Sequence, residues 1–163
     1  MKTLILMRHA KSSWKDSSLK DFDRPLKKRG VKNSTDMGKF LKKKKLLPEK
    51  ILCSSAVRAR QTVELLIDSS DYEGEVEYLE SLYMAEPSSI MKLLVDLPND
   101  LEHVMVVGHN PGLEYLLQIL SNEVEAMPTA AVAHINIKID KWKSLEDDSK
   151  AKLINLWLAK EIK

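Results

Sequence analysis

Features that mark several common classes of protein are scarce in this sequence of 163 residues. Cys53 is the single cysteine, which excludes an internal disulfide and fits a reducing compartment, the cytoplasm. The five glycines do not form the clustered pattern of a dinucleotide or nucleoside-triphosphate site. No apolar run approaches the length of a transmembrane helix, and no close set of histidines and carboxylates has metal-ligand spacing. We therefore expect neither a membrane protein nor one that needs a metal or a cofactor.

The charge balance argues against some further partners. The formal net charge is +2, so the composition does not call for nucleic acid or an anionic membrane surface. The lysine run 42–45 follows a helical pattern, and cations in the last turn of a helix complement its dipole. A solvated helix end is favoured there over a binding patch. With 44% hydrophobic and 31% charged residues, the composition is that of one globular domain, which we place over residues 1–163.

Apolar strands alternate with helical patterns along most of the chain. The predicted order is strand 3–7, helix 27–44, strand 51–53, helix 56–67, strand 75–79, helix 90–95, strand 104–108 and helix 113–120. Such alternation predicts an α/β fold with a mostly parallel sheet and right-handed crossovers. Two further segments, 131–139 and 152–158, are predicted to add an antiparallel hairpin. Residues 11–24 lack a sustained period and are expected to form a surface loop over the mouth of the first strand.

Basic side chains follow three of the predicted strands. Arg8 and His9 end the first strand. His109 follows the fourth strand, and Arg58 lies in the first turn of the helix after the second. Because parallel strands end at one edge of the sheet, where ligands bind in open α/β folds, these groups are expected to meet. A cation at a helix N-terminus opposes the dipole unless an anion is bound, so the edge is expected to hold an anion. Taken alone, His9 has an alternative as a loop histidine paired with a carboxylate.

Two histidines and two arginines without a metal suit phosphoryl transfer. Arginines bind pairs of phosphate oxygens and neutralise the charge of the transferring group. A neutral imidazole attacks phosphorus and forms a covalent intermediate that water later resolves. A second imidazole, when protonated, donates to the phosphate oxygens. Neighbouring arginines are also expected to disfavour the cationic form of His9, which keeps its ring nucleophilic.

Several segments resemble motifs of the histidine phosphatase superfamily, the relatives of phosphoglycerate mutase. Residues 6–10, Leu-Met-Arg-His-Ala, resemble its nucleophile motif, and residues 54–62 resemble its second-arginine motif. Residues 108–112, Gly-His-Asn-Pro-Gly, resemble its second-histidine motif. Arg24-Pro25-Leu26 with Arg29-Gly30 is similar to a segment of the short SixA-like branch, the phosphohistidine phosphatases. The resemblance spans nearly the whole chain, with the motifs in the family's order, and implies a three-layer α/β/α fold.

The resemblance also implies a role for each matching residue. His9 would be the phosphorylated nucleophile, Arg8 and Arg58 would clamp the phosphate, and His109 would be the second histidine. Arg24 would be an extra phosphate contact, although a plain surface cation is its alternative. The chain departs from the wider superfamily by carrying alanine, another small residue, after the Arg-His pair.

A second departure bears on the substrate. Many superfamily members place a carboxylic acid beyond the third strand to protonate an alcohol leaving group. Glu80 and Glu86 lie in that region, but no surrounding motif supports either, and a solvated surface position is favoured for both. Imidazole is a far weaker base than an alkoxide and leaves well without a dedicated acid. The expected substrate is therefore phosphohistidine on a partner protein, reached through an open groove that a short chain leaves uncovered.

Two alternatives remain open at this point, and a third, a cysteine-dependent phosphatase, is disfavoured. The same superfamily contains phosphatases of small phosphorylated molecules, and a phosphate-binding module without catalysis is compatible with the same scaffold. The interval from Cys53 to Arg58 is one residue too short for a cysteine-dependent phosphatase. Cys53 also lies in an apolar run that is typical of a core strand, which disfavours this third alternative.

Overall fold

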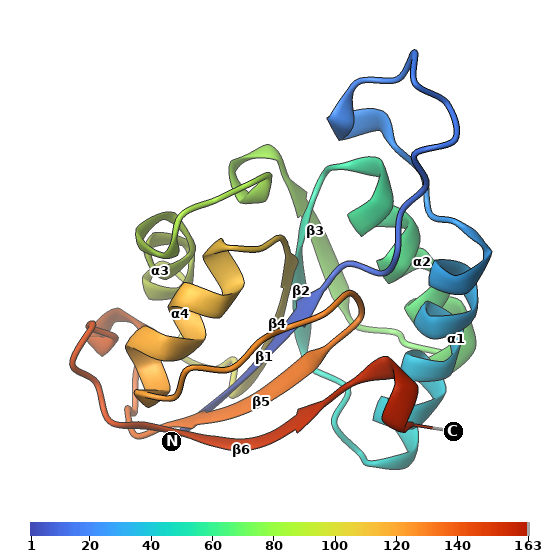
Figure 1. The fold of residues 1–163 in the computed structure, drawn as a ribbon. Coiled ribbons are helices and arrows are strands. Elements are labelled where there is room, and N and C mark those ends of the chain that lie inside the picture. Colours follow the sequence, from blue (N-terminus) through green and yellow to red (C-terminus); the bar gives the residue numbers. More distant parts are fainter. Residues whose placement is uncertain (163) are drawn as a thin grey trace.

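A computed structural model describes residues 1–162 as one six-stranded sheet with helices on both faces (Figure 1). The strand order is β3-β2-β4-β1-β5-β6. The strands are β1 (Lys2–Arg8), β2 (Lys50–Ser54), β3 (Glu75–Leu79), β4 (His103–Gly108), β5 (Val132–Ile137) and β6 (Ala151–Trp157). The helices are α1 (Lys28–Lys43), α2 (Val57–Ser70), α3 (Pro87–Val95) and α4 (Gly112–Ser121). The predicted α/β class is confirmed.

The first four strands in this order pair in parallel, and the two strands of the added hairpin pair antiparallel. β1 pairs in parallel with β4, and β2 pairs in parallel with both β4 and β3. β5 runs antiparallel to β1 and β6 antiparallel to β5, as the alternating segments predicted. In the β1–β4 register Arg8 lies opposite Gly108. The residues that follow these two strands, His9 and His109, therefore emerge side by side at one edge of the sheet.

The central strand β1 is buried on both faces because apolar side chains point to either side of it. Leu4 and Leu6 belong to the core layer that α3 and α4 cover. Ile5 and Met7 belong to the layer under α1 and α2. Figure 1 shows the two helix pairs on opposite sides of the sheet. This double cover explains why β1 has a continuous apolar run rather than an alternating one.

The loop after β1 folds back on itself and is closed at its base. Ser12 and Leu26 form an isolated antiparallel bridge. The N–H of Ser13 donates to the Pro25 carbonyl at 2.8 Å, and the N–H of Lys27 donates to the Lys11 carbonyl at 3.0 Å. The enclosed segment contains a short 3-10 turn, Asp21–Asp23, which the sequence pattern did not predict. The loop is thus a small lobe with anchored ends (Figure 1).

Details at the helix ends differ slightly from expectation. α2 continues to Ser70, three residues beyond the predicted end, and the hydroxyl of Ser70 donates to the Leu66 carbonyl at 2.7 Å. In the lysine run, Lys42 pairs with Asp71 at 2.9 Å, as suits an exposed helix end. Within residues 1–162, no helix has the length and apolar character needed to span a membrane.

Candidate active site

The carboxyl ends of β1 and β4 and the first turn of α2 enclose a cavity of about 190 Å³. The residues expected from the sequence all line it: Arg8, His9, Arg24, Arg58 and His109. All but Arg8, which is half-buried, are buried side chains. The topology therefore brings together two imidazoles and three guanidinium groups from four separate stretches of the chain. An anion is the ligand such a cavity suits.

The ring of His9 is oriented as a nucleophile. Its Nδ1 lies 2.8 Å from the carbonyl oxygen of Ala10, which can only accept a hydrogen bond, so Nδ1 carries the proton. Nε2 is then unprotonated, and it lies 3.4 Å from the donating Nε of Arg58. The lone pair of Nε2, which accepts this long hydrogen bond, is thus directed into the group of cations that line the cavity.

Burial lowers the pKa of His9 to about 4, with smaller contributions in the same direction from Arg58, Arg8 and Arg24. The ring is consequently neutral near pH 7, as the sequence analysis expected. The main cause differs from that expectation, because removal from water outweighs repulsion by the arginines.

His109 faces His9 across the cavity, with ring centroids 5.0 Å apart and planes inclined by 52°. Its Nε2 lies 2.8 Å from Oγ of Ser54, and its Nδ1 lies 3.5 Å from Nη2 of Arg58. Since arginine has no acceptor atom, this arrangement places the His109 proton on Nε2. Burial, followed by the neighbouring His9 and Arg58, lowers the pKa of His109 to about 3. Its ring is neutral in this arrangement, whereas the sequence analysis expected a protonated second imidazole.

Asp21, in the lobe after β1, is a site residue that the sequence analysis missed. Its backbone carbonyl accepts from Nη1 of Arg58 at 2.6 Å, and its Oδ2 accepts from Nη2 of the same group at 3.0 Å. The carboxylate also accepts from Arg24 at 2.9 Å and from the Tyr83 hydroxyl. These hydrogen bonds, that of Tyr83 first, lower the pKa of Asp21. The sequence did hold one indication of its role: Asp21 lies three residues before Arg24, a spacing typical of ion pairs.

Arg8 and Arg24 are each held by main-chain carbonyls. Nη1 of Arg8 donates to the Met127 carbonyl at 3.2 Å, and Nε of Arg24 donates to the Ser13 carbonyl at 3.2 Å. Arg24 also donates to the hydroxyl of Ser12, and its guanidinium lies 3.3 Å from the ring centroid of Trp14. Arg24 is therefore a buried cation at the cavity rather than a plain surface residue.

The remaining candidates lie apart from this cavity. Glu80 and Glu86 are exposed, and neither lines the cavity, in agreement with a surface position. Cys53 is buried in the core layer beneath α1 and α2, where burial raises the pKa of its thiol. Among residues 1–162, no three histidine, cysteine or carboxylate side chains are grouped to hold a metal ion.

The chain is similar to known proteins in both sequence and structure. The model of the histidine phosphatase superfamily, branch 1, matches residues 4–83. An uncharacterized protein of Mycobacterium leprae is 31% identical over 156 residues, which cover 88% of this chain and 94% of that protein. The phosphohistidine phosphatase SixA of Escherichia coli is 29% identical over 138 residues, covering 82% and 84% of the two chains. A structure of the protein histidine phosphatase SixA with tungstate has a TM-score of 0.82, 24% identity and 98% coverage of both chains.

Proposed function

The chain belongs to the histidine phosphatase superfamily, and we propose that this phosphatase hydrolyses phosphohistidine on a partner protein through a covalent phosphate on His9. The observation that carries the proposal is the state of the His9 ring. Its Nδ1 keeps a proton that it donates to the Ala10 carbonyl, and its unprotonated Nε2 faces the guanidinium of Arg58. An attacking lone pair and the charge that stabilises a phosphoryl group therefore share one small cavity.

In the first step, Nε2 of His9 attacks phosphorus while the bond from phosphorus to the substrate imidazole breaks. The substrate ring takes up a proton from water on its other nitrogen before the bond breaks, so the electron pair of that bond leaves on a neutral imidazole. Arg8, Arg24 and Arg58 are placed to bind the phosphoryl oxygens and balance their charge. The dianionic phosphoryl group also favours proton uptake by His109, which would raise the low pKa of that ring and let it donate to an oxygen.

In the second step, water attacks the phosphorus on His9. The N–P bond breaks and its electron pair returns to Nε2. Inorganic phosphate leaves with the oxygen and one proton of the water, and the second proton neutralises the hydroxide left by the first step. Because Nδ1 keeps its proton, hydrogen-bonded to the Ala10 carbonyl, throughout, the ring returns to the tautomer in which it started.

The cavity lining supports a P–N rather than a P–O substrate. Among the described residues that line the cavity there is no glutamate or aspartate. The nearby Asp21 has a lowered pKa and accepts hydrogen bonds from Arg58 and Arg24, so it is a poor proton donor. An alkoxide needs such a donor to leave, whereas imidazole does not. The name of the Escherichia coli relative is in agreement with this preference.

Transfer of a 32P label tests the covalent step. The protein is mixed with a 32P-phosphohistidine peptide and quenched in alkali, in which phosphohistidine survives. We expect an acid-labile label on the wild type and none on His9→Ala. His134→Ala is the matched control, because His134 stacks on Trp157 at 6.2 Å and does not line the cavity. Phosphate binding without label or turnover would instead indicate a non-catalytic module.

A substrate panel tests the preference for P–N bonds. We expect faster hydrolysis of the phosphohistidine peptide than of p-nitrophenyl phosphate or phosphoglycerate, with every activity lost in His9→Ala. Comparable turnover of phosphohistidine and phosphoglycerate would assign the protein to the small-molecule phosphomonoesterases instead. The cytoplasmic location and the single domain over residues 1–163 stay predictions.

A further inference from the structure

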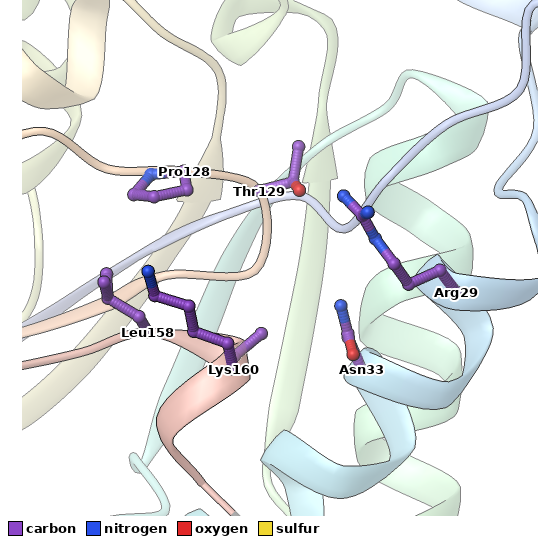
Figure 2. A pocket seen from close by; sticks show the side chains of 7 residues that line it. Arg29, Asn33, Pro128, Thr129, Leu158 and Lys160 are labelled. Atoms are coloured by element: carbon purple, nitrogen blue, oxygen red, sulfur yellow. The ribbon is translucent and has the colours of Figure 1, made fainter.

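A second and larger hollow, of about 420 Å³, adjoins the active-site cavity. Its walls come from three places: Arg29 and Asn33 on α1, the turn at Pro128 and Thr129, and residues 158–160 at the C-terminal 3-10 turn (Figure 2). Thr129 lines both this hollow and the active-site cavity. A ligand that spans the mouth of the site therefore has this hollow as its next available space.

The shared wall is fixed to the strand that carries the nucleophile. The N–H of Ala130 lies 3.0 Å from the His9 carbonyl, and the N–H of Ala131 closes a turn onto the Pro128 carbonyl at 3.0 Å. The preceding carbonyl, that of Met127, accepts from Arg8. The hollow is thus held at a constant position relative to His9, as a subsite for an extended substrate requires.

The lining combines an apolar floor with two cations. Pro128, Leu158 and Ala159 are the apolar residues of the lining. Figure 2 shows the guanidinium of Arg29 extending toward Thr129 and the Lys160 side chain lying beside Leu158. No acidic residue among those described lines the hollow, and no ion pair is formed by Arg29 or Lys160 within residues 1–162.

Two carboxylates close in sequence to lining residues of the hollow have other partners. Glu161 accepts from the backbone N–H of Leu158 at 3.1 Å, and Asp36 pairs with Lys32 at 2.6 Å. Both line a different hollow, on the far side of the 3-10 turn. Within residues 1–162, the hollow beside Thr129 therefore offers two cations whose charge is not balanced by a lining carboxylate.

We propose that this hollow is a docking subsite for an acidic side chain of the partner protein, near its phosphohistidine in sequence. The inference rests on the proposed function and adds the chemistry that selects the partner. Arg29 and Lys160 would bind the carboxylate, and the floor of Pro128 and Leu158 would pack on an apolar neighbour. The volume lies within the range of ordinary ligand pockets, which leaves room for both. The active-site cavity would hydrolyse the phosphohistidine, and the hollow would determine which partner protein binds.

Peptides that differ in one charge test the subsite. Phosphohistidine peptides with a glutamate scanned along either side of the phosphohistidine are compared with their glutamine versions and with free phosphohistidine. We expect one position where glutamate raises kcat/KM about five- to tenfold, mainly through KM, and where the advantage declines with salt. The advantage is expected to disappear in R29E/K160E, while kcat/KM for free phosphohistidine changes less than twofold.

Charge exchange and a matched control complete the test. A lysine at the selected peptide position is expected to restore about the wild-type kcat/KM in R29E/K160E. Lys152→Glu reverses one cation, half of the charge change in R29E/K160E, near the start of β6, at the end of the sheet opposite His9, and is expected to keep the glutamate preference. Equal rates for the glutamate and glutamine peptides would overturn the docking inference, as would an equal loss on free phosphohistidine. Failure to hydrolyse any phosphohistidine substrate would overturn the proposed function itself.

Discussion

Asp21 holds Arg58 at two points: its carboxylate Oδ2 lies 3.0 Å from Nη2 and its backbone carbonyl lies 2.6 Å from Nη1. Arg58 in turn directs Nε toward Nε2 of His9. The lobe after β1 therefore sets the orientation of a guanidinium that belongs to α2. A guanidinium held in a fixed orientation is already in place when charge develops in the transition state.

Asp21→Ala is expected to lower kcat/KM about 10- to 100-fold, because it removes charge-assisted hydrogen bonds that orient Arg58 and Arg24. The loss should be similar for phosphohistidine peptides and p-nitrophenyl phosphate, since both need the arginines. Asp21→Asn is expected to be milder, because its amide oxygen still accepts from Arg58. Steady-state kinetics check the effect, with the fully exposed Asp16→Ala in the same loop as control. Activity within twofold of wild type in Asp21→Ala would rule out the positioning role.

Ser54→Ala is expected to reduce kcat about tenfold with little change in KM. Oγ of Ser54 is the partner of the His109 Nε2 proton at 2.8 Å, so its removal releases the ring from its tautomer and orientation. The neighbouring Ser55→Ala is the control, since the Ser55 hydroxyl is buried and has no hydrogen-bond partner among residues 1–162. Steady-state kinetics of the two variants give the comparison. Equal kcat values for both would show that Ser54 does not orient His109.

Gly112→Ala is expected to destabilise the protein by about 1–3 kcal/mol, whereas Gly108→Ala is expected to be tolerated. A Cβ on Gly112 would overlap the Ala85 carbonyl oxygen, but one on Gly108 would lie 3.6 Å from Leu113 in ordinary contact. Urea unfolding gives the free energy of unfolding of each variant. Equal stabilities for the two variants would contradict the close backbone approach at Gly112.

The free energy of unfolding is expected to fall as the pH decreases from about 6.5 to about 4. Burial lowers the pKa of His103 to about 4, while an unfolded chain keeps it near the ordinary value of 6.5. Between these values the unfolded state binds a proton that the folded state does not, so stability is complete above this window and is lost within it. Urea unfolding across this range measures the slope. His103→Gln is expected to reduce the slope but not to abolish it, because the lowered pKa values of His9 and His109 act in the same direction. An unchanged slope would rule out a contribution from His103.

The fold and the core of the site were predictable because each rests on a contiguous pattern. The apolar runs of β1 and β4 end directly on His9 and His109, and parallel pairing is enough to bring those ends together. Arg58 was recognisable because it opposes the helix dipole in the first turn of α2. The antiparallel hairpin followed from strict alternation in β5.

The remaining features depend on contacts between distant segments, which no local pattern encodes. Asp21 faces Arg58 and Tyr83 only because the lobe folds back over the sheet edge. Neither Gly108 nor Gly112 has a positive φ, and Gly112 is needed instead for its close packing against the Ala85 carbonyl, a contact between distant segments. The hollow beside Thr129 is formed by residues of α1 and by residues 158–160 near the C-terminus, and a hydrophobic pattern along the sequence does not predict a contact between such distant segments.

The anchored base of the lobe has a consequence for how proteins of this design diversify. The bridge of Ser12 with Leu26 and the bond from Lys27 to Lys11 seal off the intervening stretch from the sheet. Residues 15–19, near its tip, are exposed and follow Trp14, which lines the cavity. We therefore expect exchanges at this tip to alter the approach to the cavity, and with it substrate choice, while both stems stay in register and the free energy of unfolding changes little.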